Sequence, residues 1–226
     1  MLVYLILFFL ITILPILWSN YIFNKYDKII HDMPYSGYEF GKLLINEFKL
    51  KGVLIESSSK GDYYDLDHKK VKVNETRLKR KSLTSISIIC HEIGHAIQHS
   101  QNYPPLSKRN ELIKNTEWLT KISSALIYFG FPAIFASGSL SLVKICLAII
   151  FISLLIGFII HLVTLEVEFD ASFKKAYPIL KRKLPEIYHK SCYSILRAAA
   201  FTYLIGVFKN IISLRVIWNL ISKYRF

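Results

Sequence analysis

Two long segments of this chain lack the charged side chains that a water-soluble fold needs. The first, residues 1–18, carries no charged side chain, and as a helix it would be about 27 Å long. The second, residues 122–165, holds one basic side chain, Lys144, and no acidic one. Helices that are apolar on every side are buried in a large core or in a bilayer, and a chain of 226 residues is too small for the first alternative. Both segments therefore predict integral membrane helices.

The two segments are expected to cross the bilayer in different ways. Residues 1–18 have neither a basic start nor a cleavage site of the A-x-A type, so we interpret them as a retained anchor and not as a signal peptide. Residues 122–165 are long enough for two spans, and "SGSLS" at 137–141 supplies a turn between them. This second segment is predicted to be a transmembrane hairpin.

The C-terminal segment, residues 194–226, allows two interpretations. Residues 198–208 are apolar, but Lys209 and Arg215 interrupt the pattern. Such a segment is either a further membrane span, with its basic side chains reaching towards the interface, or an amphipathic helix that lies on the membrane surface. The sequence leaves both interpretations open.

Positive charge dominates the chain, which has 29 Lys and Arg against 16 Asp and Glu and a formal net charge of +13. Basic residues stand beside the apolar segments at positions 25–28, 114–121 and 174–175. Because basic residues next to spans face the cytoplasm, we expect a multi-pass protein of the cell membrane with residues 19–121 and 166–193 on the cytoplasmic side. The membrane accounts for the excess charge, so no nucleic-acid partner is predicted. The three cysteines fit reduced thiols in that compartment.

The polar region between the apolar segments predicts a small domain with helices and strands. A short amphipathic helix is expected from Ser36 or Tyr38 to Leu50, followed by two short strands at residues 53–55 and 71–73. A second helix should run from about Lys81 or Ser82 to Gln101, because the two prolines of "NYPPL" prevent its continuation. The fold class is therefore mainly α, with membrane helices and a small cytoplasmic α+β domain that contains a short sheet.

The second of these helices carries the sequence "HEIGH", which has the spacing of a zinc site. His91 and His95 are four residues apart, so they lie on one face of a helix and can reach the same ion. Glu92 lies beside the first histidine, where its carboxylate can serve as a general base. This H-E-x-x-H pattern is typical of zinc metallopeptidases. His99 continues the same face but is about 12 Å along the axis from His91, which is too far for a shared ion.

A catalytic zinc site needs a third protein ligand, and the acidic cluster at residues 166–170 can supply it. An even number of predicted spans separates this cluster from the histidines, so both lie on the same side of the membrane. In a helix, Glu166 and Glu168 point about 200° apart and cannot both face one ion. Glu166 has Asp170 one turn on, which could orient a histidine, whereas Glu168 has Ser172 at that offset. Spacing alone leaves both glutamates open.

Several motifs in order along the chain resemble one known family. They are "HEIGHAIQH", "YPPL", the apolar hairpin, "VTLEVEFDAS" and "LRAAAFTYL". Together they resemble the bacterial membrane-bound neutral zinc metallopeptidase family (YugP-like), and the resemblance implies a zincin-like metallopeptidase domain. The segment "EFDAS" is in turn similar to the E-[FY]-x-A-D segment of CAAX-prenyl-protease-type gluzincins, whose glutamate binds zinc. The resemblance therefore implies that Glu168 is the third ligand and that Glu166 is its rival.

These observations predict a membrane-embedded zinc endopeptidase that acts on peptides or proteins, membrane proteins among them. Zn²⁺ is expected at His91, His95 and Glu168, with Glu92 as the general base and Tyr203 as a candidate oxyanion donor. The strand at residues 71–74 is expected to pair through its edge with an extended substrate. The alternative is a non-enzymatic metal-binding or metal-transporting membrane protein, which should carry polar ligands within its spans.

The predicted orientation can be tested with single cysteines and an impermeant thiol reagent. A cysteine in place of Ser139, in the hairpin turn, should react on intact cells, because that turn is expected to face outwards. A cysteine in place of Lys60 should react only after the cells are opened. The reverse labelling pattern would overturn the orientation.

Overall fold

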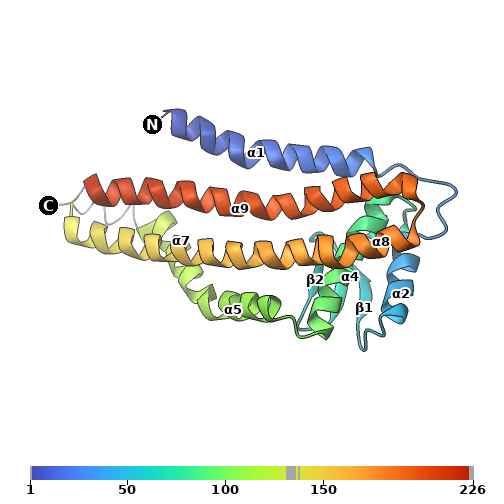
Figure 1. Ribbon diagram of the computed structural model, residues 1–226. Coiled ribbons are helices and arrows are strands. Elements are labelled where there is room, and N and C mark those ends of the chain that lie inside the picture. Colours follow the sequence, from blue (N-terminus) through green and yellow to red (C-terminus); the bar gives the residue numbers. More distant parts are fainter. Residues whose placement is uncertain (1, 131–135, 137, 224–226) are drawn as a thin grey trace.

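Three long helices form one layer of the computed structural model, which describes residues 2–130, 136 and 138–223. They are α1 (Leu2–Lys25), α7 (Leu140–Phe169) and α9 (His189–Lys223), and α9 lies between the other two (Figure 1). A smaller unit of helices and strands packs against one end of this layer. The chain is thus mainly helical, as the sequence predicts.

The smaller unit contains a three-stranded sheet that packs against α4. Its elements are α2 (Gly37–Glu47), β1 (Leu54–Ser57), β2 (Tyr63–Asp65), β3 (Lys70–Val73), α3 (Glu75–Lys79) and α4 (Leu83–Ser100). The strand order is β1-β3-β2, with β1 parallel and β2 antiparallel to β3. In this register Ile55 and Tyr64 both pair with Val71, from opposite sides. The sheet edge that lies next to α4 therefore belongs to β2.

Two of the three strands match the predicted ones, but the role predicted for the second is wrong. β3 hydrogen-bonds to β1 on one side and to β2 on the other, so neither of its edges is available to a substrate. The strand that the sequence pattern does not predict is β2, which is only three residues long. Two aspartates at the ends of β2 form hydrogen bonds that stabilise it. Asp62, just before the strand, accepts a hydrogen bond from the Asn74 backbone N–H at 2.8 Å, and Asp65, its last residue, accepts one from the His68 N–H at 3.1 Å.

Local capping bonds set the starts of α2 and α4, and both predicted helices are confirmed. At α2, Ser36 and Glu39 form a capping box in which each side chain accepts a hydrogen bond from the other residue's backbone N–H. At α4, the Ser82 hydroxyl accepts a hydrogen bond from the Ser85 N–H at 3.1 Å. α4 ends ahead of Pro104, which opens the next helix because a proline at the first helical positions costs no backbone bond.

The predicted hairpin is described only in part. α5 (Pro104–Ala125) continues into η1 (Leu126–Gly130), a π-helical turn, and α5 packs on α7. The rest of the first predicted span, residues 131–135, and residue 137 in the predicted turn lie outside the described residues. Gly138 has a φ of +70°, a left-handed conformation that glycine adopts without strain, and α7 begins two residues later.

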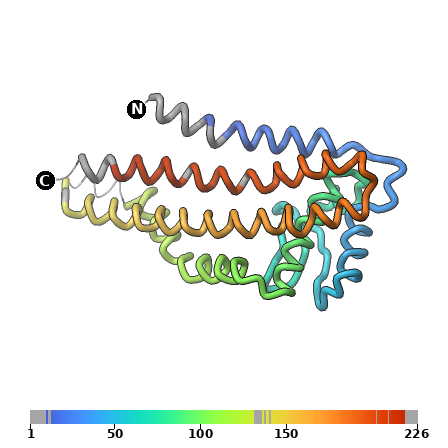
Figure 2. The backbone as a smooth tube through the Cα atoms, viewed as in Figure 1, coloured from blue at the N-terminus to red at the C-terminus, as the bar shows by residue number. Residues whose placement is uncertain are grey.

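α7 continues without a break into two further helical segments. They are η2 (Asp170–Ala176), which is π-helical, and α8 (Tyr177–Lys183); the 3-10 turn η3 (Glu186–Tyr188) then leads back into α9 (Figure 2). Two stretches among the described residues, Ser141–Lys183 and Glu186–Trp218, are long and apolar enough to cross a membrane. The predicted anchor at residues 1–18 falls mostly on residues whose side chains lie outside the described part, so its role stays a prediction.

α4 is the central element of the smaller unit, since every residue from Leu83 to Gln98 is buried. It approaches η2 most closely at Gly94, where a Cβ atom would lie 2.9 Å from the carbonyl oxygen of Ala171. A glycine inside a helix costs about 1 kcal/mol relative to alanine. Here the missing side chain lets two helices approach more closely than any other residue would allow.

Replacing Gly94 with alanine should therefore destabilise the protein, although alanine is the better helix former. We expect a loss of about 1–3 kcal/mol in the free energy of unfolding, because the new methyl group overlaps a backbone carbonyl that cannot move freely. The measurement is the midpoint of denaturant unfolding in detergent. Gly157→Ala is the matched control, since its Cβ would come no closer than 3.4 Å to Asn210 Nδ2. Equal stability of the Gly94 variant and the wild type would contradict this account of the packing.

Candidate metal centre

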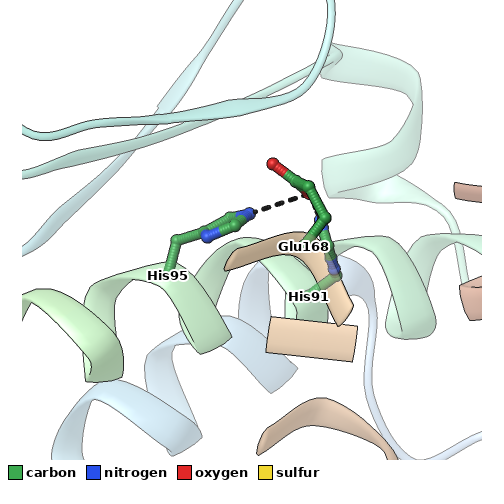
Figure 3. A group of neighbouring side chains, drawn as sticks. All are labelled: His91, His95 and Glu168. Carbon is green, nitrogen blue, oxygen red and sulfur yellow. Dashed lines mark ion pairs between the residues drawn. The ribbon is translucent and has the colours of Figure 1, made fainter. Parts of the chain in front are cut away.

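Two histidines on α4 present their imidazole rings to one point. His91 and His95 are one helical turn apart, and their ring centroids are 4.7 Å apart with the planes nearly perpendicular. Figure 3 shows the two rings rising from the same helix towards Glu168, which reaches them from α7. All three side chains are buried.

Glu168 contributes a carboxylate oxygen to the same point. Its Oε2 atom lies 3.1 Å from His91 Nε2 and 3.3 Å from His95 Nε2, and the side chain is 1% exposed. Oε2 has no hydrogen-bond partner. Among the described residues, these three form the one group of His, Cys, Asp or Glu side chains with ligand atoms close enough to share an ion.

Hydrogen bonds hold the other ring nitrogen of each histidine. His95 Nδ1 lies 3.0 Å from Gln98 Oε1, and His91 Nδ1 lies 3.0 Å from Ser172 Oγ. The orientation of the Gln98 amide follows from its nitrogen, which donates to the Val167 carbonyl at 2.9 Å and to the Asp170 carboxylate. Gln98 Oε1 therefore accepts a hydrogen bond from His95 Nδ1–H, and the other ring nitrogen, Nε2, faces Glu168.

The separations between the Glu168 oxygen and the two imidazole nitrogens fit a tetrahedral zinc ion. Zinc bonds of about 2.0–2.1 Å at tetrahedral angles separate two ligand atoms by roughly 3.3 Å. The observed separations from Glu168 Oε2 to the two Nε2 atoms are 3.1 and 3.3 Å. Buried lone pairs that face one another without a donor between them are unfavourable unless a proton or a cation lies there. The donor set of two imidazoles and one carboxylate is one that zinc uses in catalytic sites.

The Glu168 carboxylate raises the proton affinity of the histidine beside it. Burial would lower the pKa of His95, but the Glu168 carboxylate overrides that effect and raises the pKa to about 9. At neutral pH the metal-free centre therefore holds an imidazolium paired with a carboxylate. A metal ion that enters must displace this proton, so metal binding weakens as the pH falls below about 9.

Glu92 lies in the same site but does not belong to the group of three. Burial raises the pKa of its carboxyl, while the two histidines and a hydrogen bond from the Tyr64 backbone N–H lower it in part. Its side chain is buried on the side of α4 that faces the edge strand β2. The centre thus combines three potential metal ligands with a separate carboxyl group, that of Glu92, whose proton affinity is raised.

Two more side chains reach the centre from other helices. Arg109 on α5 places Nη1 3.9 Å from Glu168 Oε1, and its buried Nε atom has no hydrogen-bond partner. Tyr203 on α9 hydrogen-bonds to Glu168 and lies within the electrostatic influence of Glu92 and Arg109. The sequence motifs predict Tyr203 as a site residue but neither Arg109 nor Gln98. A polar residue three positions after His95 is a usable signal for Gln98, whereas no local pattern marks Arg109.

The remaining candidate residues lie away from the three acceptor atoms. Glu166 is exposed and receives a long hydrogen bond of 3.5 Å from the Tyr103 hydroxyl. His99 Nδ1 lies 2.9 Å from the Tyr64 hydroxyl, on the face of α4 that the sheet covers. His161 on α7 packs against Gly206 of α9. Of the two rival glutamates, the structure therefore brings only Glu168 to the histidines.

Comparisons with known proteins agree with the family suggested by the motifs. A model of the family described as "Putative neutral zinc metallopeptidase" matches residues 1–222. The chain is also 28% identical over 195 residues to "Putative membrane protease YugP" of Bacillus subtilis (strain 168), an overlap that covers 85% of this chain and 83% of that protein. No solved structure matches the chain. The resemblance inferred from the sequence is thereby confirmed.

Paired substitutions of the two rival glutamates test the geometry of the centre. Glu168→Gln should weaken zinc binding at least about tenfold, because an amide oxygen is a poorer zinc ligand than a carboxylate. Glu166→Gln should bind zinc like the wild type, since its side chain lies outside the group. Competition with a chromophoric chelator measures both affinities. If the Glu166 variant lost zinc binding and the Glu168 variant kept it, Glu166 and not Glu168 would be the residue of α7 that faces the histidines.

Proposed function

The chain belongs to the neutral zinc metallopeptidase family, and from that premise we propose that it is a membrane-embedded zinc endopeptidase. The observation that carries the proposal is the convergence of His91 Nε2, His95 Nε2 and Glu168 Oε2 in a buried site beside the Glu92 carboxylate. The first three side chains would hold the ion, and Glu92 would remain available for proton transfer. This division of roles is the one that peptide hydrolysis requires.

A bound zinc ion would supply Lewis acidity to the scissile carbonyl and to the attacking water. Glu92 would accept the proton that the water loses and donate it to the nitrogen of the leaving amine. Burial supports this role, because it raises the pKa of Glu92 and so makes the carboxylate a stronger base near neutral pH. Gln98 and Ser172 would keep the imidazoles in the orientation that leaves both Nε2 atoms to the ion.

Two donors are available for the negative charge that develops on the carbonyl oxygen. The Tyr203 hydroxyl and the Arg109 guanidinium both approach Glu168 from outside the group of three. The Arg109 guanidinium adds positive charge near the same carboxylate. We assign Tyr203 the role of oxyanion donor, with Arg109 beside it.

The edge of β2 is the natural place for the substrate backbone. The Tyr64 N–H points away from β3 and towards Glu92, so the outer edge of β2 faces the site. An extended peptide that pairs with this edge would run past the three ligands. Beyond the end of the strand, a cavity of about 370 Å³ opens between the β2–β3 turn and α5, lined in part by Leu66, His99 and Asn110. This arrangement replaces the pairing with β3 that the sequence suggests.

Several features support an embedded protein with its site at the cytoplasmic surface. Ser141–Lys183 and Glu186–Trp218 have the length and composition of membrane spans. α9 lies as one helix between α1 and α7, which supports a span and not a surface helix for residues 194–223. The basic residues beside the spans support the cytoplasmic location.

The rival function, metal transport, is less well supported. A transporter passes its ion between successive polar sites within the spans. Among the described residues a single group of potential ligands occurs, and it lies where α7 leaves its long apolar stretch. The Glu92 carboxylate beside the group also has a role in hydrolysis and none in simple ion storage.

The test separates proton transfer from metal binding at one residue. Glu92→Gln should retain about one zinc ion per chain, because Glu92 is not one of the ligands, while proteolysis should fall by at least about 10²-fold. Zinc content by atomic emission and cleavage of casein or a membrane-protein substrate are the two measurements. His91→Ala is the matched control, which should lose both zinc and activity. Full activity in the Glu92 variant would refute the peptidase mechanism.

A further inference from the structure

The exposed surface of α7 defines an apolar belt whose height matches a bilayer. Large exposed aliphatic side chains occur from Leu142 to Leu162, a distance of about 30 Å along a helix. This equals the thickness of the hydrocarbon core of a typical membrane. The ionisable side chains of this stretch, Lys144 and His161, lie within two residues of its ends. The belt therefore ends close to Leu162 on the side of the smaller unit.

An aromatic cluster follows directly beyond the belt. Its rings are Phe169, Phe173, Tyr177 and Tyr193, with neighbouring centroids 5.2–5.3 Å apart. Phe169 and Tyr193 remain 45% and 41% exposed, so the cluster faces outwards from α7 and α9. Amphipathic aromatic side chains such as tyrosine concentrate at the boundary between hydrocarbon and water.

The first helix carries aromatic residues at the same level. Ser19 Oγ of α1 donates a hydrogen bond to the Ala198 carbonyl of α9, which is five residues, or about 7.5 Å, nearer the apolar belt than Tyr193. Next to it, the Trp18 ring packs against Phe201 and lies 5.4 Å from the Arg197 guanidinium. Three neighbouring helices thus place aromatic side chains in one band.

Exposed basic side chains lie on the far side of this band from the apolar belt. They are Lys181, Arg182 and Lys190. Basic residues just outside the hydrocarbon are attracted to anionic lipid headgroups by about 1 kcal/mol each. Apolar belt, aromatic band and basic residues follow in the order that a membrane surface requires.

The metal centre lies at the end of the aromatic cluster that is nearest the apolar belt. Glu168 directly precedes Phe169, but it is buried against α4 whereas Phe169 is exposed on the other side of the same helix. It stands six residues past Leu162, which is about 9 Å along the axis. The interfacial layer adds about 5–8 Å to each side of the hydrocarbon core, so this height is its outer edge. Tyr203 approaches the centre from a position closer to the apolar belt than Glu168. Gly206, one turn further along α9, packs against His161, which lies at the end of the belt.

We propose that the metal centre sits at the lipid headgroup layer and that its substrates are extended segments next to a membrane anchor. This inference rests on the peptidase function proposed above and adds the substrate class to it. An extended chain advances about 3.3 Å per residue, so a height of about 9 Å corresponds to three residues from the hydrocarbon edge. The scissile bonds therefore lie about three to ten residues from a transmembrane segment or lipid anchor. The larger values apply when the substrate chain runs at a slant from the membrane to β2.

The height of the centre is measurable without catalysis. In the Glu92→Gln protein reconstituted into vesicles, single fluorescent labels at Phe169→Cys, Ile187→Cys and Ile152→Cys are compared for quenching by nitroxide lipids. Phe169, which directly follows Glu168, should be quenched best by a headgroup nitroxide and Ile152 by a nitroxide deep in the acyl chain. Ile187, which is 79% exposed in the turn beyond α8, should be quenched least. Equal quenching of Phe169 and Ile187 would place the metal centre outside the membrane surface and overturn the inference.

The substrate class is measured with a ladder of anchored substrates. All carry one transmembrane segment and one cleavable sequence, separated by flexible spacers of about 3, 6, 10, 20 and 30 residues. Wild-type protein in the same vesicles should cleave the substrates with spacers of three to ten residues at least about tenfold faster than the longest one. Rates that are flat or rise towards the longest spacer would overturn the inference while the peptidase function stands. Cleavage that persists in the Glu92→Gln protein would instead refute the proposed function.

Discussion

The close approach of α4 and η2 is the contact on which the rest of the centre depends. At Gly94 the two backbones meet with no side chain between them, and the carbonyl of Ala171 occupies the space of the missing Cβ. This contact places the end of α7 across the histidine helix. From that position Glu168 faces both Nε2 atoms, and Ser172, one helical turn later, reaches His91 Nδ1. A side chain at position 94 would separate these partners by more than the tolerance of a metal site.

The contact between α4 and η2 also buries the metal centre, and this burial determines its electrostatics. Glu168 and the histidines are almost completely shielded from water, so lone pairs that converge there cannot be satisfied by solvent. The Glu168 carboxylate raises the pKa of His95, which favours a positive charge at this point. Gln98 links this centre to α7 a second time, since its amide bridges His95 to the Val167 carbonyl and the Asp170 carboxylate. The histidine helix and the glutamate helix are therefore held together at three neighbouring points.

Local sequence signals predict the histidine helix, whereas contacts between distant segments decide the rest of the site. The Ser82 cap, the i, i+4 histidines and the two prolines act within a few residues, so the limits of α4 are readable from the sequence. The choice between Glu166 and Glu168 is not, because periodicity shows that they point in different directions but not which direction faces α4. β2 escapes prediction because it is three residues long and its register comes from β3. Neither the π-helical turn at residues 170–176 nor the approach of Arg109 has a local signature, since both arise from packing.

The central claim is that two imidazoles of α4 and one carboxylate of α7 hold a zinc ion. The X-ray absorption spectrum of the zinc-loaded protein at the zinc edge tests this most directly. The account predicts four or five nitrogen and oxygen ligands at about 2.0–2.1 Å, with the outer-shell scattering of two imidazole rings, and loss of one ring's scattering in His95→Ala. A sulfur ligand at about 2.3 Å, or a spectrum without imidazole scattering, would contradict it.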